Sequence, residues 1–191
     1  MRLFRKHHTP AEVGAIVYET LRSSLAAASG PLTIGHLLGL LGRAEGNMPE
    51  MHVGEIVCGA MFAASIALER SVPRWMAAEI LRGMRDELSR HLHEQGAADD
   101  QVAEWERILD ARSAAYRESL ADYDGLEPPW KLGRAFLWNV TGERLYNALA
   151  IKHATHYILA LRDRAQEAIN AYGPTIEVFP SGRPPEVPGR N

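Results

Sequence analysis

Hydrophobic residues recur at helical spacing through most of this 191-residue chain. Val13, Val17 and Leu21 open the pattern at intervals of four, which places them on one face of a helix. Turns rich in glycine and proline separate the periodic stretches. Only Thr175–Phe179 resembles a short strand. The pattern therefore predicts an all-α fold.

Start and stop signals divide the chain into helices. Thr9-Pro10-Ala11-Glu12 is a capping box with an early proline, and Asn47-Met48-Pro49-Glu50 repeats the arrangement. Ser71-Val72-Pro73 and Asp99-Asp100 begin two more helices, and we expect a last helix from about Glu143. These five helices end near residues 30, 70, 95, 124 and 172, and short segments lie at 32–41 and 128–140. The sequence predicts a single-domain bundle of five or six helices.

The composition of the two ends differs from that of the middle. Residues 1–8 form a basic N-terminal arm, and residues 9–173 form the helical bundle domain. Residues 174–191 are a Pro/Gly-rich tail, which we expect to be extended. This Pro-rich C-terminal tail cannot form a core of its own.

The periodicity also assigns residues to faces. Residues 56–68 lack charge and mark a buried central helix, and their length of thirteen is too short for a membrane span of about 20 residues. We expect Trp75 to point inward on the following helix. Gly35 and Gly39 share one side of the 32–41 segment, which predicts close packing against a neighbour.

Charge and cysteine content exclude several classes of protein. The net charge is −3 with both signs interspersed, which argues against nucleic-acid binding. A lone cysteine, Cys58, permits neither an intrachain disulfide nor a cysteine-based metal site. Its place in an apolar helix predicts a buried, unreactive thiol. The N-terminus lacks the apolar core of a secretory signal, and we expect a cytoplasmic protein.

Histidine is the residue type that could support a metal site. His52 and Glu55 lie three apart on one predicted helix, and His153 and His156 have the same spacing on the last one. Facing pairs of this kind build metal sites in bundles, here for Zn²⁺ or Fe²⁺. The sequence contains no Glu-x-x-His motif, however, and we expect both His153 and His156 to be structural, on a packed side with Tyr146 and Leu149.

No catalytic residue, cofactor-binding motif or phosphate loop stands out. The stretch from Trp130 to Trp138 is dense in aromatic residues, and Trp130, Phe136 and Trp138 either close the core or form an interface. The sequence favours a non-enzymatic cytoplasmic protein that acts through protein–protein interaction, with another protein or as a homodimer. The alternative is a helical-bundle enzyme with the Zn or Fe site between the third and last helices.

Overall fold

The structure is a computed structural model that describes residues 8–45, 52–121 and 129–172. These residues form seven helices and no strand, which confirms the all-α class. The helices are α1 (Pro10–Ala26), α2 (Ile34–Glu45), α3 (Val53–Ser71), α4 (Arg74–Glu94), α5 (Asp99–Glu118), α6 (Trp130–Thr141) and α7 (Ala148–Tyr172). The predicted number of five or six is too low, because both short segments are full helices of 12 residues.

Several other expectations concern residues that the structure does not describe. The tail at 174–191, the arm up to residue 7 and Asn47–Glu50 lie outside the described ranges, but the N-cap of the central helix α3 is His52 and not Asn47. The division of the chain into arm, bundle and tail therefore stays a prediction. Within the described helices, none combines the length and hydrophobicity that crossing a bilayer requires.

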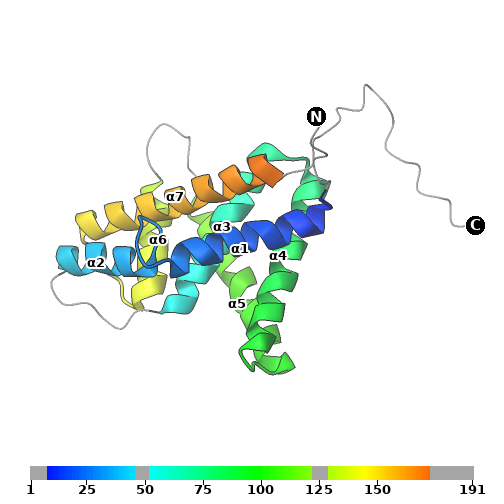
Figure 1. Ribbon diagram of the computed structural model, residues 1–191. Coiled ribbons are helices and arrows are strands. Elements are labelled where there is room, and N and C mark those ends of the chain that lie inside the picture. The colour runs from blue at the N-terminus through cyan, green and yellow to red at the C-terminus, as the bar shows by residue number, and fades with distance from the viewer. Residues whose placement is uncertain (1–7, 46–51, 122–128, 173–191) are drawn as a thin grey trace, which may run out of the picture.

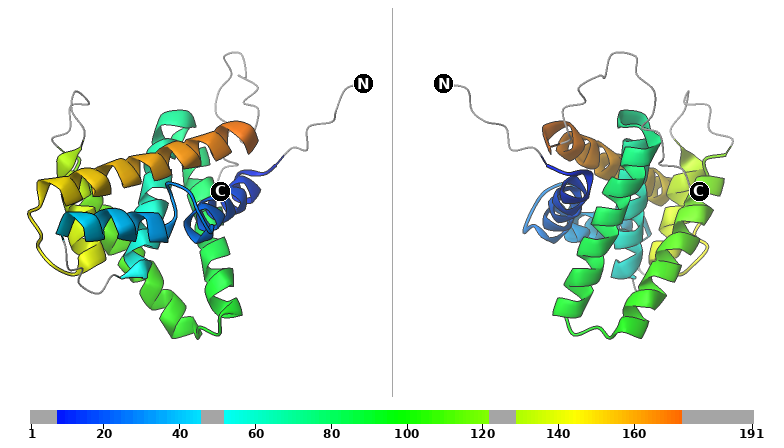
Figure 2. Two further views of the ribbon diagram at one scale, coloured as in Figure 1. Left: turned by 60° about the vertical axis from the view of Figure 1, so that its left-hand side comes forward. Right: turned by 90° about the vertical axis from the view of Figure 1, so that its right-hand side faces the viewer.

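Helix α3 lies at the centre of the bundle. Helices α1 and α7 cross in front of it in Figure 1, α2 lies to one side against α7, and α4, α5 and α6 also contact α3. Eleven of its residues are buried, among them Ile56, Phe62 and Leu68, which confirms the central buried helix. Figure 2 shows that α4 and α5 form a hairpin whose far end projects from the rest of the bundle.

Local caps explain where the helices begin and end. The capping box of Thr9 and Glu12 is present at the start of α1. Gly142 ends α6 with a φ of 70°, a left-handed conformation that suits glycine. Helix α7 begins at Ala148 and not near Glu143, because the Asn147 Oδ1 accepts the backbone N–H groups of Leu149 and Ala150.

Two assignments of residues to faces are wrong. Trp75 is 63% exposed, because it lies in the first turn of α4 and Met76 turns into the core in its place. Gly35 and Gly39 are exposed, and a Cβ at either would meet no atom within 4 Å. Helix α2 packs through Leu37 and Leu41 instead, since the leucine side chains bury far more apolar surface than the glycine face does.

Helices α1 and α4 cross at a contact between two glycines. A Cβ at Gly14 would lie 2.2 Å from the backbone oxygen of Ile80, and a Cβ at Gly83 would lie 2.2 Å from that of Ala11. The obstacle is backbone in both cases, so no side-chain rotation can relieve it. The crossing therefore requires glycine on both helices.

We predict that Gly83→Ala lowers the free energy of unfolding by at least about 2–3 kcal/mol, because the two helices must separate to admit a methyl group. Gly39→Ala is the matched control. It adds the same methyl group to an open helical position and should stabilise the protein by about 0.5–1 kcal/mol. Urea unfolding followed by circular dichroism measures both, and equal effects of the two substitutions would contradict the close crossing.

Candidate functional site

Glu55 is bound to arginine and not arranged as a metal ligand. Its two carboxylate oxygens accept hydrogen bonds from Nε and Nη2 of Arg112 on α5, at 2.6 and 2.5 Å. This bidentate geometry occupies the carboxylate on both oxygens. The Glu55 side chain is 12% exposed and that of Arg112 is 36% exposed, so the pair is half-buried between α3 and α5. The hydrogen bond and charge of Glu55 raise the pKa of Arg112.

The four residues proposed as metal ligands do not converge. His52 is the exposed N-cap residue of α3, and its ring lies beside Gly142 at the end of α6. His156 is exposed and contacts the ring of Trp130, at 6.4 Å between ring centroids. Among the described residues, no group of three or more His, Cys, Asp or Glu side chains is placed to hold a metal ion.

His153 is half-buried on α7, in a cationic environment. Burial lowers the pKa of His153, and the charges of Lys152, His156 and His36 lower it further. The predicted packed side with Tyr146 and Leu149 is wrong, since these two side chains are 69% and 49% exposed. Tyr146 precedes the helix, so it does not share a helical face with His153.

The buried polar groups near Glu55 offer no nucleophile. Cys58 is buried as expected, and burial raises the pKa of its thiol to about 12, which keeps the thiol protonated at neutral pH. The hydroxyl of Tyr116 is buried and makes no hydrogen bond of normal geometry in the described structure, although the Asn139 side chain lies close enough to lower its pKa. Burial raises the pKa of Tyr116 as well, so it is also neutral.

The aromatic stretch of α6 divides between core and surface. Phe136 is buried and stacks on Tyr157 of α7 at 6.1 Å between ring centroids, so it belongs to the core. Trp130 is 39% exposed and Trp138 is half-buried. Trp130, Arg134 and Trp138 are spaced four apart, which places them along one face of α6.

Two arginines lie over the ring of Trp138. The guanidinium carbon of Arg134 is 5.1 Å from the ring centroid, and that of Arg144, in the connection between α6 and α7, is 5.6 Å away. Tyr146 meets the same ring edge-on at 5.3 Å. The Trp138 indole N–H donates to the backbone oxygen of Leu145 at 2.6 Å, which fixes the ring against the connection. We call Trp130, Arg134, Trp138, Arg144 and Tyr146 the aromatic–cationic face.

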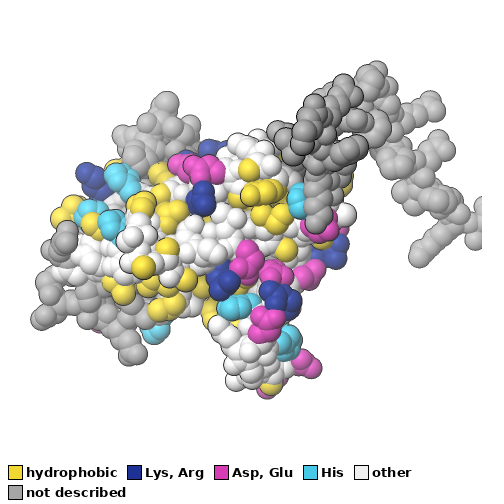
Figure 3. Space-filling view, viewed as in Figure 1, with side chains coloured by type: hydrophobic (Ala, Val, Ile, Leu, Met, Phe, Trp, Pro, Cys, Tyr) yellow, Lys and Arg dark blue, Asp and Glu magenta, His cyan; other side chains and the backbone are white. Residues whose placement is uncertain are grey.

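The two arginines of this face lack an acidic partner among the described residues. No carboxylate of the described structure lies within ion-pair distance of Arg134 or Arg144, whereas most other arginines, such as Arg22 with Glu19 and Arg117 with Glu69, have one. From Trp130 to Leu161 the sequence contains one acidic residue, Glu143. In Figure 3, both signs of charge intermix over α4, while the described side chains at the end where α7 begins are basic, histidine and hydrophobic.

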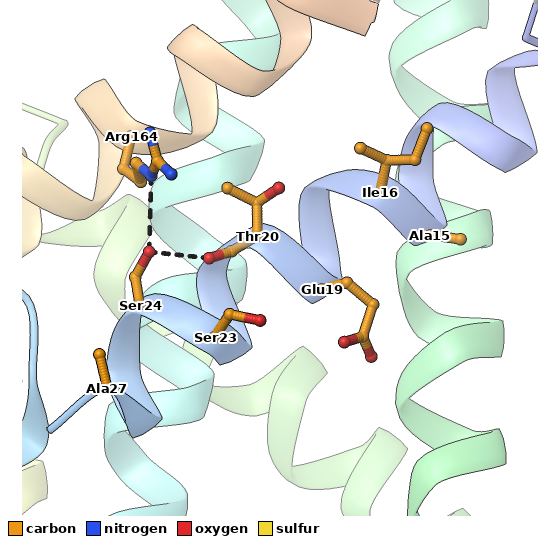
Figure 4. A pocket seen from close by; sticks show the side chains of 8 residues that line it. All are labelled: Ala15, Ile16, Glu19, Thr20, Ser23, Ser24, Ala27 and Arg164. Carbon is orange, nitrogen blue, oxygen red and sulfur yellow. Dashed lines mark hydrogen bonds between the residues drawn. The ribbon is translucent and has the colours of Figure 1, made fainter.

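An open groove of about 650 Å³ runs along α1. Small side chains of α1 line it, including Thr20, Ser23 and Ser24, and Arg164 reaches over from α7 (Figure 4). Ser24 Oγ donates to the backbone oxygen of Thr20 and accepts from Arg164 Nε, so these polar groups already have partners. Glu19 is paired with Arg22, and the groove presents no group poised for catalysis.

No family model matches the chain, and neither the curated proteins nor the solved structures contain a significant match. The aromatic–cationic face therefore has to be interpreted from its own geometry. The sequence pointed to Trp130 and Trp138, but it did not indicate that Arg134 and Arg144 meet at one indole ring. The spacing of Arg134 and Trp138, four residues apart on one helix, was the available signal. Arg144 lies beyond the glycine that ends α6, and no periodicity extends across that break.

We predict that Glu55→Gln lowers the free energy of unfolding by about 1–2 kcal/mol, because Arg112 loses a charge-assisted bidentate partner in a half-buried position. Glu69→Gln is the control, since it breaks an exposed pair between the same two helices and should cost less than about 0.5 kcal/mol. A strong chelator should not change the melting temperature of either protein. A melting temperature that the chelator lowers in the native chain but not in Glu55→Gln would instead support the metal site.

We also predict that acid destabilises the fold partly through His153. The pKa of His153 in the folded state is depressed, so the unfolded chain binds more protons at this residue. The contribution of neutral His153 to the free energy of unfolding is therefore lost as the pH falls below the pKa of an unfolded histidine, about 6.5. The test compares unfolding free energies at pH 8 and pH 5 for the native chain and for His153→Gln. The substitution should reduce the difference between the two pH values, and an unchanged difference would contradict the assignment.

Proposed function

We propose that this protein acts without catalysis, by binding another protein on the aromatic–cationic face. The observation that supports the proposal is the placement of Arg134 and Arg144 over the Trp138 ring without a carboxylate partner in the described structure. Tryptophan, tyrosine and arginine are the residue types that dominate binding energy at protein interfaces. Here all three occur together on a rigid helix and the turn that follows it.

The charge of the face favours an acidic partner. An arginine stacked on an indole ring keeps the N–H groups at its edge available, so Arg134 and Arg144 can donate to carboxylates of a bound segment. Trp130 and Tyr146 add exposed aromatic surface on either side, which suits aliphatic side chains. The occupant that meets both requirements is an acidic amphipathic helix, with leucine-type residues on one side and carboxylates beside them.

A second copy of the chain fits this face less well. In a twofold dimer the same surface would meet itself, so Arg134 and Arg144 would face their own counterparts. Like charges brought together in this way oppose association. We therefore propose a different protein as the partner and not a homodimer through this face.

A nucleic acid also fits less well. Sequence-independent binding of nucleic acid relies on many phosphate contacts, often six to ten, and the face offers far fewer cations. The chain as a whole has a net charge of −3. The alternative of a metal-dependent enzyme would need ligands outside the described residues, since Arg112 occupies Glu55 and no three described His, Cys, Asp or Glu side chains are placed to hold a metal ion. We propose the cytoplasm as the place where the interaction occurs.

We predict that a fluorescein-labelled helical peptide with Glu and Leu at amphipathic spacing binds the full chain, as measured by fluorescence anisotropy. Replacing both arginines, with Arg134→Glu and Arg144→Glu, should weaken binding at least tenfold, because two attractive charges become repulsive. Affinity should also fall as salt is raised. The matched control is Arg70→Glu with Arg74→Glu, which makes the same change of charge at two exposed arginines of the α3–α4 corner and should leave binding unchanged.

Two further probes separate the alternatives. A scrambled peptide of the same composition has the same charge but no apolar side, and it should bind at least tenfold more weakly. Equal binding of the scrambled peptide, or no binding of either peptide, would contradict an amphipathic partner. An oligothymidine that binds more tightly than the peptide, and that no longer binds after the two arginines are replaced, would favour a nucleic acid as the partner.

A further inference from the structure

A cleft of about 340 Å³ lies where α3, α4 and α5 meet, away from the aromatic–cationic face. Each helix contributes one stripe of side chains to it, with Met61 and Ser65 from α3, Leu81 from α4, and Leu109 and Ser113 from α5. Met61, Ser65 and Leu109 are buried, and Leu81 is half-buried, so the floor of the cleft is largely apolar. This volume is at the lower end of the range for pockets that bind small molecules.

Three arginines and no carboxylate line the cleft. Arg82 and Arg85 come from α4 and Arg117 comes from α5. Their carboxylate partners stand outside the lining: Glu79 for Arg82, Asp110 for Arg85 and Glu69 for Arg117. These ion pairs are exposed on at least one side, and exposed pairs contribute little to stability. A ligand carboxylate could therefore take over an arginine at small cost.

The two serine hydroxyl groups of the cleft differ in whether they can donate a hydrogen bond to a ligand. Ser65 Oγ donates to the backbone oxygen of Phe62 at 2.7 Å, so its proton is already used. Ser113 makes no hydrogen bond in the described structure, and it lies one helical turn after Asp110 and one turn before Arg117. Asp110 binds Arg85. An anionic group beside Ser113 would thus lie between Arg85 and Arg117.

We propose that this cleft binds a small amphipathic anion, an aliphatic monocarboxylate of medium chain length. Its carboxylate accepts hydrogen bonds from Arg85, Arg117 and the Ser113 hydroxyl, and its tail covers Met61 and Leu109. Charge-assisted hydrogen bonds to guanidinium are the strong ones, and bidentate geometry favours a carboxylate. A polyanion is excluded because Glu69, Glu79 and Asp110 surround the arginines. This proposal is independent of the proposed protein-binding face.

Isothermal titration of the full chain with octanoate tests the proposal. We expect one octanoate per chain, and binding at least tenfold weaker for Arg85→Gln. Asp110→Asn removes the carboxylate that competes for Arg85, and it should tighten binding several-fold, which a merely structural role of Arg85 would not produce. Arg107→Gln is the control, since Arg107 is exposed on α5, pairs with Glu104 and does not line the cleft.

Further probes test the chemistry and the location. Octylammonium and octanol have the same tail without the negative charge, and equal binding of either would overturn the anion site. Ala78 is exposed at the cleft, so Ala78→Trp should block octanoate without unfolding the chain, whereas Ala103→Trp on the exposed side of α5 should not. Octanoate binding that survives both Arg85→Gln and Ala78→Trp, or no octanoate binding at all, would overturn the proposal.

Discussion

The glycine contact between α1 and α4 determines how the rest of the bundle is arranged. Without side chains at Gly14 and Gly83, the two backbones approach until a Cβ on either would lie 2.2 Å from a carbonyl oxygen of the other. Such close approach increases the dispersion contacts along the whole crossing. Helix α4 packs far more extensively against α1 than against α5, and the cleft lies on the side of α4 that faces α5.

Helix α5 is held mainly by α3, and small residues again make the contact possible. A Cβ at Gly54 would lie 2.6 Å from the Trp105 ring, and next to it Glu55 binds Arg112. Helix α6 docks by the same means, because Gly59 receives the Phe136 ring and Gly133 approaches Thr155. Glycines within helices thus lower the intrinsic stability of each helix, by roughly 1 kcal/mol relative to alanine, while they permit the contacts that join the helices.

This use of glycine explains which features of the fold the sequence predicted. Caps act over a few residues, so Thr9 and Glu12 marked the start of α1 correctly. The role of a helical glycine depends on a partner far along the chain, and the pattern gave Gly35 and Gly39 the packed role that Gly14 and Gly83 fulfil. Trp75 was assigned inward by periodicity alone, whereas in the first turn of α4 it is Met76 that is buried. His52, Glu55, His153 and His156 had suitable spacing within each helix, but the pairing of Glu55 with Arg112 is a tertiary contact.

The arginines of the two proposed sites are held in different ways, and this difference bears on what each site can bind. In the cleft, Arg85 and Arg117 are oriented by carboxylates, so an incoming anion must compete with Asp110 and Glu69 for the same N–H donors. At the aromatic–cationic face, Arg134 and Arg144 lie over the Trp138 ring, and no carboxylate among the described residues pairs with them, so we expect their N–H donors to be open to a ligand. A ligand gains the full value of each new hydrogen bond only in the second case. The face is therefore suited to a partner with several carboxylates, whereas the cleft depends on its apolar floor for most of its affinity.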